Sequence, residues 1–138
     1  MNDLKRAINS LDEHSVCLCK GESIIFSDKR GVLPLVGFIS EGVDLSGFSA
    51  ADKVVGKAAA MLFIKAGVTS IYAKTLSKSA EAVFNRYGVK YSYNELTDKI
   101  INRDGTDICP MEKAVADISD PNAAYIAIVN KLNSLKNK

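Results

Sequence analysis

The chain has 138 residues, of which 47% are hydrophobic and 25% charged, and its formal net charge is +2. This length fits a single domain over residues 1–138 with its own core. The small charge gives no reason to expect nucleic acid or a membrane surface as a partner. No apolar run reaches the roughly 20 residues that span a bilayer. With three cysteines and no expected export signal, the sequence predicts a reduced, cytoplasmic protein.

The first third of the chain predicts a helix followed by a hairpin. Apolar residues at helical spacing predict a helix over residues 3–11. Alternating residues predict strands over 15–20 and 23–27, joined by a short glycine turn. Pro34 then suits the first turn of a short helix.

Residues 49–67 predict a buried central helix around which the other elements pack. Ser49 can cap its start, and Gly67 can end it in the left-handed conformation. The apolar residues between them have the spacing of a buried helical face: Val54, Val55, Ala58, Ala59, Leu62, Phe63 and Ala66. Asp52, Lys53 and Lys57 form the polar end of this helix and the first candidate site.

The rest of the chain predicts strands and helices in alternation. A β-rich run over 68–73 is followed by a helix capped by Ser77, and a second strand covers 89–93. Further helices begin near Pro110 and Pro121. This succession predicts an α/β protein, a three-layer α/β/α sandwich with a mixed sheet and right-handed crossovers.

Two stretches resemble the signatures of an uncharacterised prokaryotic family of unknown function. They cover residues 51–59 and 100–113, and read ADKVVGKAA and IINRDGTDICPMEK. That family is assigned to the cytidine-deaminase-like fold, so the resemblance, which covers roughly residues 15–132, implies this fold for the chain. It implies no settled activity.

The chain departs from zinc deaminases at the positions where metal ligands belong. A His or Cys ligand and a general acid/base Glu begin the buried helix in those enzymes, and a Pro-Cys-x-x-Cys pair begins the next. The matching positions fall near 51–53 and 76–80, which lack such ligands, and the sole histidine is His14. Because catalytic zinc needs three protein ligands, we expect no zinc and no other cofactor.

Cys109 is the sharpest local signal. If Pro110 is the first helical residue, Cys109 is the N-cap, and Glu112 can complete a capping box. A thiol at the positive end of a helix dipole is acidified and can act as a nucleophile. The alternative interpretation is a small cap residue, because no histidine is placed by sequence to act as its base.

The other candidates are ligand-binding residues. Asn102, Arg103, Asp104 and Thr106 belong to a polar loop that holds an anionic or hydroxyl-bearing ligand, or else to a turn stabilised by its own side chains. Asp52, Lys53 and Lys57 edge the cleft, or else only favour the helix dipole and reach water.

As a hypothesis, Asp52, Lys53, Arg103, Asp104 and Cys109 converge on one site. Three functions follow from these candidates. The first is a zinc-free deaminase-like domain that binds a small anionic or nucleotide-like ligand. The second is a metal-free enzyme that uses Cys109 as nucleophile, with Asp52 or Lys53 in acid–base work. The third is an oligomerisation or interaction module, such as a homodimer.

Overall fold

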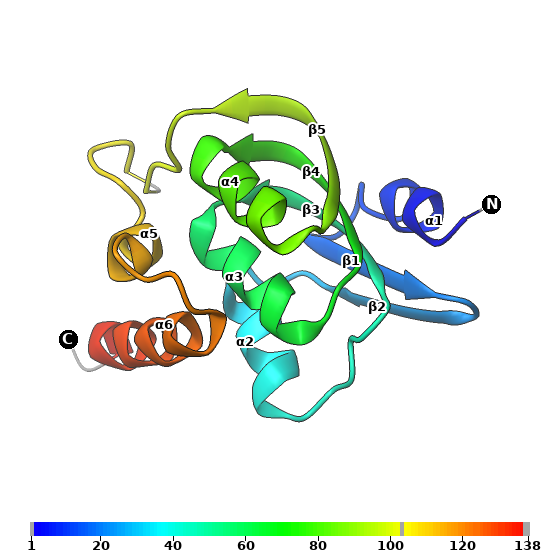
Figure 1. Ribbon diagram of the computed structural model, residues 1–138, viewed down its shortest axis with the longest axis horizontal. Helices are drawn as coiled ribbons and strands as arrows, with labels where there is room; N and C mark the ends of the chain where they lie inside the picture. Colours follow the sequence, from blue (N-terminus) through cyan, green and yellow to red (C-terminus); the bar gives the residue numbers. More distant parts are fainter. Residues whose placement is uncertain (1, 103, 137–138) are drawn as a thin grey trace.

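The computed structural model describes residues 2–102 and 104–136, whose arrangement is shown in Figure 1. Its helices are α1 (Asp3–Asn9), α2 (Leu33–Ser40), α3 (Lys57–Ala66), α4 (Lys78–Tyr87), α5 (Pro110–Val115) and α6 (Pro121–Lys136). Its strands are β1 (Val16–Lys20), β2 (Ser23–Ser27), β3 (Ser49–Val55), β4 (Ser70–Ser77) and β5 (Lys90–Thr97). None of these helices is long and apolar enough to cross a membrane.

The five strands form one mixed sheet in the order β2-β1-β3-β4-β5, which confirms the predicted α/β class. β1 is antiparallel to both of its neighbours, whereas β3, β4 and β5 are parallel to one another. The carboxyl ends of these three strands therefore lie at one edge of the sheet, where α3 and α4 begin. In open α/β sheets this edge is where ligands bind.

Helices cover both faces of the sheet, in three layers. On one face α1 packs on β1 and β3 through a small cluster that contains Ala7, Leu11, Cys19 and Ala51. On the other face α3 contacts α2, α4, α5 and α6. Figure 1 shows α5 and α6 at the end of the molecule opposite α1.

α3 is the centre of the main core, as the sequence predicts. Its Leu62 and Phe63 are fully buried, and its small residues Ala58 and Ala60 let other elements approach closely. Gly67 ends the helix with φ 83, and the N–H of this glycine donates to the carbonyl of Ile64. The buried face of the predicted central helix is thus confirmed from Lys57 onward.

The first part of that predicted helix is wrong, because Ser49–Val55 forms strand β3. β3 lies between two other strands and is covered on both faces, so Ala50 and Ala51 are both fully buried although they point to opposite sides. A strand buried on both faces reads as a continuous apolar run rather than an alternating one. Asp52 and Lys53 therefore lie within a central strand, and Gly56 is the N-cap of the helix.

Candidate functional site

The start of α3 is bonded to α5 through a single carboxylate. Glu112 accepts hydrogen bonds from the backbone N–H of Lys57 at 2.7 Å and from that of Ala58 at 2.8 Å. These are two of the first-turn donors that a helix leaves without an internal partner. The predicted capping box between Cys109 and Glu112 is therefore wrong, since this side chain caps another helix 55 residues away.

Gly56 makes the contact between α3 and α5 sterically possible. A Cβ atom at this position would overlap the Glu112 carboxylate, so only glycine leaves room for it. A second bond joins the same helices, because the Lys57 ammonium donates to the carbonyl of Ala116 at 2.9 Å. The short helix α5 is thus held at both of its ends against the start of α3.

A cleft of about 310 Å³ lies at the carboxyl edge of the sheet, and we call it the edge cleft. Its lining residues come from α3, α4, α5 and the segments between β5 and α5: Lys57, Ser79, Asp98, Lys99, Ile100, Ile108, Glu112 and Ala116. Both carboxylates of the lining are engaged, since Asp98 pairs with Lys78 at 2.7 Å and Glu112 caps α3. This ion pair lowers the pKa of Asp98.

The lysines of the edge cleft are less engaged than its acids. Lys57 donates to a neutral carbonyl rather than to a carboxylate. Lys99 is exposed, and it forms no ion pair within residues 2–102 and 104–136. Glu112 also keeps its charge, because its two partners are neutral N–H groups. Lys57 and Lys99 outnumber this one carboxylate, so the balance of charge in the lining favours an anionic ligand.

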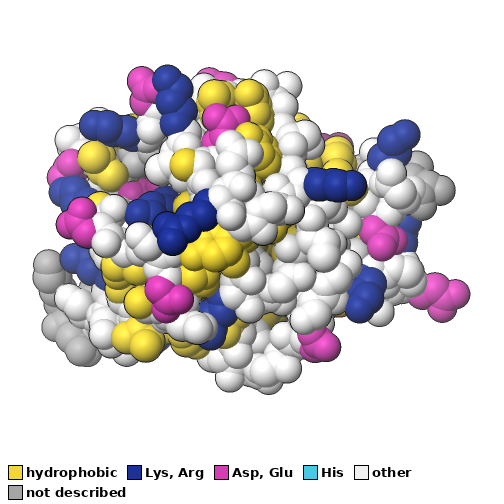
Figure 2. All heavy atoms as spheres, viewed as in Figure 1, with side chains coloured by type: hydrophobic (Ala, Val, Ile, Leu, Met, Phe, Trp, Pro, Cys, Tyr) yellow, Lys and Arg dark blue, Asp and Glu magenta, His cyan; other side chains and the backbone are white. Residues whose placement is uncertain are grey.

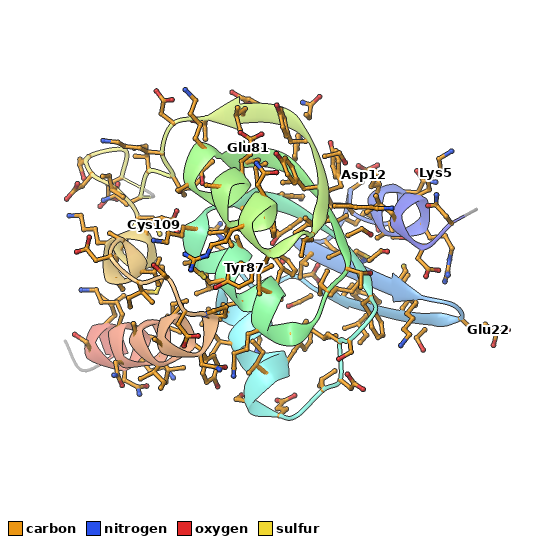
Figure 3. The ribbon with its side chains drawn as sticks, viewed as in Figure 1. Lys5, Asp12, Glu22, Glu81, Tyr87 and Cys109 are labelled. Atoms are coloured by element: carbon orange, nitrogen blue, oxygen red, sulfur yellow. The ribbon has the colours of Figure 1, made fainter. Side chains whose placement is uncertain are left out.

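A second, smaller pocket of about 100 Å³ adjoins the edge cleft, and we call it the Cys109 pocket. It shares Ile100 and Glu112 with the edge cleft, and the rest of its lining is mainly apolar: Gly31, Val32, Val54, Gly56, Ala58, Ala59, Cys109 and Met111. Figure 3 shows Cys109 at the start of α5. Its side chain is half-buried, and its backbone N–H donates to the carbonyl of Ile100 at 2.9 Å.

Two of the predicted site residues, Lys57 and Cys109, line these adjoining cavities. Asp52 does not. It lies opposite Val16 and Ala73 in the neighbouring strands, so its carboxyl group points into the main core on the α3 side. Lys53 is exposed on the same strand and lines neither cavity.

Burial dominates the electrostatics of Asp52. Desolvation raises the pKa of its carboxyl group to about 8, and hydrogen bonds from the backbone N–H groups of Lys53 and Val54 only partly oppose this shift. The carboxyl group is therefore mostly protonated at neutral pH. A protonated carboxyl group buried inside a sheet is a poor candidate for the acid–base work that the sequence suggested for Asp52.

The polar loop before α5 is stabilised by its own side chains. The Asn102 side-chain oxygen accepts from the N–H groups of Thr106 at 3.0 Å and Asp107 at 3.4 Å. Asp104 and Thr106 are exposed, and Asn102 is half-buried without lining either cavity. This geometry favours the turn interpretation for these three residues, and Arg103 lies outside the described residues.

No group of three or more His, Cys, Asp or Glu side chains that could hold a metal ion occurs among the described residues. The absence of zinc from the protein stays a prediction, which rests on the residue types at the helix starts.

Sequence reasoning missed several residues that line the edge cleft. Ser79 and Lys99 are ordinary polar residues that follow β4 and β5, and only the parallel pairing of these strands brings them together. A signal was available in principle, because the carboxyl ends of parallel strands meet at one edge of a sheet. The missed strand β3 concealed it.

This geometry defines an α/β domain built on a mixed sheet, with adjoining cavities at the carboxyl ends of its parallel strands. The family model described as TM1506, domain of unknown function (DUF1893), matches residues 6–132, so the chain belongs to the DUF1893 family. The expectation of an uncharacterised family of unknown function is confirmed at this level.

Solved structures agree with this assignment. The crystal structure of a DUF1893 family protein (TM1506) from Thermotoga maritima is 32% identical, with a TM-score of 0.84, and the match covers 95% of this chain and 91% of that one. A diaminohydroxyphosphoribosylaminopyrimidine deaminase/5-amino-6-(5-phosphoribosylamino)uracil reductase from Thermotoga maritima overlaps 67% of this chain and 35% of its own, at 15% identity and a TM-score of 0.43. The second overlap is too loose to carry an argument. No curated protein matches the chain.

Proposed function

We propose that this domain binds a small anionic ligand in the edge cleft and does no zinc chemistry. The observation that carries the proposal is the charge of the lining. Asp98 is ion-paired with Lys78 and Glu112 is held by two backbone N–H groups. Neither lysine of the lining, Lys57 or Lys99, forms an ion pair among the described residues. The position of the cleft, outside the carboxyl ends of parallel strands, supports the same conclusion.

We assign the architecture to the cytidine-deaminase-like class on the order of its elements: a hairpin, a helix, a strand and a second helix. In this assignment, the positions that correspond to the metal ligands of zinc deaminases are the starts of α2 and α3. The sequence alone had suggested residues 51–53 and 76–80.

These corrected positions still lack a metal-ligand set. Val32 and Gly56, the N-caps of α2 and α3, both line the Cys109 pocket. The described residues of that pocket offer one thiol and one carboxylate, from Cys109 and Glu112. A catalytic zinc needs three protein ligands, so the residues do not fit the metal.

A titration followed by heteronuclear NMR tests the proposal. The probes are inorganic phosphate, ribose 5-phosphate and cytidine 5′-monophosphate. Binding in the edge cleft shifts the amides of Lys99, Ile100 and Ile108, and Lys99→Gln weakens it because the variant removes a cation from the lining.

The matched control is Lys5→Gln, which makes the same charge change on α1, at the far end of the molecule in Figure 3. Equal weakening in the two variants would mean that only net charge matters. If none of the three probes shifts the amide signals of the edge cleft, even at high concentration, the proposal is contradicted.

A second candidate function is supported by the position of Cys109. Its half-buried side chain lines a largely apolar pocket beside the edge cleft, so a ligand bound there would lie close to a thiol. If the protein is a metal-free enzyme with Cys109 as nucleophile, incubation with a substrate should leave a covalent adduct on this residue, detected as an increase in mass. Cys109→Ser should abolish the adduct.

A further inference from the structure

A groove between α3 and α4 continues the edge cleft, and we call it the α3–α4 groove. It has a volume of about 220 Å³ and shares Lys57 and Ser79 with the edge cleft. Met61, Val83 and Ile118 form an apolar wall, and Arg86 and Tyr87 stand at the end of α4. Figure 2 shows apolar side chains between α4 and α6 on this face, with cationic side chains beside them.

The charge of the groove has one sign. Lys57 and Arg86 line it, and no carboxylate does so among the described residues. Arg86 is exposed and takes part in none of the ion pairs between described residues. The guanidinium of an arginine matches a carboxylate or a phosphate group with two parallel hydrogen bonds.

Tyr87 makes two contacts at the end of the groove, one with the segment before α6 and one with Arg86. The Tyr87 hydroxyl donates to the carbonyl of Ser119 at 2.8 Å, which fastens the segment before α6 to the end of α4. The Arg86 guanidinium carbon lies 5.6 Å from the centre of the Tyr87 ring, so the aromatic face helps to position the cation. Tyr87 is labelled in Figure 3.

We propose that the α3–α4 groove is a subsite for an anion attached to an apolar ring, with Arg86 binding the anionic group and the apolar wall packing on the ring. This inference rests on the proposed function, because the groove extends the same cleft. The volume is smaller than the roughly 300–1,000 Å³ of sites for drug-sized ligands, so it suits a single ring with one charged substituent.

Phenyl phosphate is the probe, because it combines an anionic group with an apolar ring. Inorganic phosphate carries only the anionic group, and benzyl alcohol carries only the ring. In an NMR titration of the full chain we expect phenyl phosphate to shift the amides of Val83, Arg86 and Tyr87. We expect it to bind at least about tenfold more tightly than either half, because charge and apolar contact act together.

Variants of Arg86 test the assigned role. Arg86→Gln should weaken the binding of phenyl phosphate at least about tenfold. Arg86→Lys should restore part of the affinity, because lysine keeps the positive charge but lacks the two parallel N–H donors of the guanidinium. Arg30→Gln makes the same charge change outside the groove and should leave the affinity unchanged. Dispersed amide spectra of each variant show that the fold is kept.

The outcomes separate this inference from the proposed function. Shifts confined to Lys99, Ile100 and Ile108, with affinity lost in Lys99→Gln but kept in Arg86→Gln, would leave the proposed function standing and overturn the subsite. No shift at Val83 or Arg86 up to about 10 mM phenyl phosphate, which corresponds to a binding free energy weaker than about 3 kcal/mol, would also overturn it.

Discussion

Replacing Asp52 by asparagine should make the protein more stable at neutral pH. The carboxyl group is buried on the α3 side of strand β3, and desolvation raises its pKa from 3.8 to about 8. Asparagine has nearly the same shape and cannot ionise. It therefore removes the cost of keeping a proton on a group that would lose it in the unfolded chain.

The magnitude follows from the raised pKa. Between pH 3.8 and neutrality the unfolded chain ionises Asp52 while the folded chain does not, and each pH unit costs about 1.4 kcal/mol of unfolding free energy. Over this interval the cost reaches as much as about 4 kcal/mol. Asparagine can lose one of the two backbone hydrogen bonds, worth about 1 kcal/mol, so we expect a net gain of about 2–3 kcal/mol at pH 7.

The sign of the effect fixes the shape of the pH profile. A group whose folded-state pKa is raised destabilises the protein progressively as pH rises from the unfolded value toward the folded one. The advantage of Asp52→Asn is therefore absent below about pH 4, grows up to about pH 8, and stays constant above it.

Urea unfolding from pH 3 to 9 measures this difference directly. Asp12→Asn is the control, because Asp12 is exposed, as labelled in Figure 3, and an exposed substitution should change stability by less than about 0.5 kcal/mol. A difference between wild type and Asp52→Asn that does not depend on pH would refute the reasoning, as would an asparagine variant that is less stable at pH 8.

Two further predictions concern the start of α3 and the thiols. Gly56→Ala should displace the Glu112 carboxylate and cost about 1.5–3 kcal/mol, the value of hydrogen bonds to a charged group, whereas Gly37→Ala, which meets nothing within 4 Å, should cost nothing or stabilise α2. Equal denaturation midpoints for the two variants would contradict this. Iodoacetamide should alkylate half-buried Cys109 before Cys17 and Cys19, which are fully buried and whose thiol pKa values burial raises. Mass spectrometry of peptides at short reaction times checks the order.

Elements with local signals could be predicted from the sequence. Ser77 caps α4 by accepting from the N–H of Ala80 at 3.1 Å, and Gly88 ends the same helix with φ 70. Both features depend on residues within a few positions of each other, so their physical chemistry is visible in the chain. The hairpin of β1 and β2 is predictable for the same reason.

Strand β3 could not be separated from a helix because its environment is not local. Ala50 and Ala51 are small and apolar, and both are buried because helices cover both faces of the sheet. Such residues fit a buried helix equally well, so periodicity does not decide between the two. Gly56 was the residue of this stretch that argued most clearly against a continuous helix, since a glycine inside a helix costs about 1 kcal/mol relative to alanine.

The role of Glu112 was also beyond local reasoning. Its spacing from Cys109 satisfies a capping box, yet its carboxylate bonds to the start of α3, which lies 55 residues earlier in the chain. The pattern was correct in recognising a capping side chain and wrong about which helix it caps. Only the packing of α5 against α3 decides between these two sets of donors.

The position of Glu112 limits which groups can hold an anionic ligand. A helix start is ordinarily favourable for an anion, because its free N–H groups and its dipole both attract negative charge. At α3 the N–H groups of Lys57 and Ala58 are already taken by this carboxylate, which the chain supplies itself. A ligand in the edge cleft would therefore be held by side-chain cations, chiefly Lys57 and Lys99, rather than by the helix backbone. For the same reason we expect a side-chain cation, Arg86, to bind the anion in the α3–α4 groove. The Tyr87 ring helps to position its guanidinium, which forms no ion pair among the described residues.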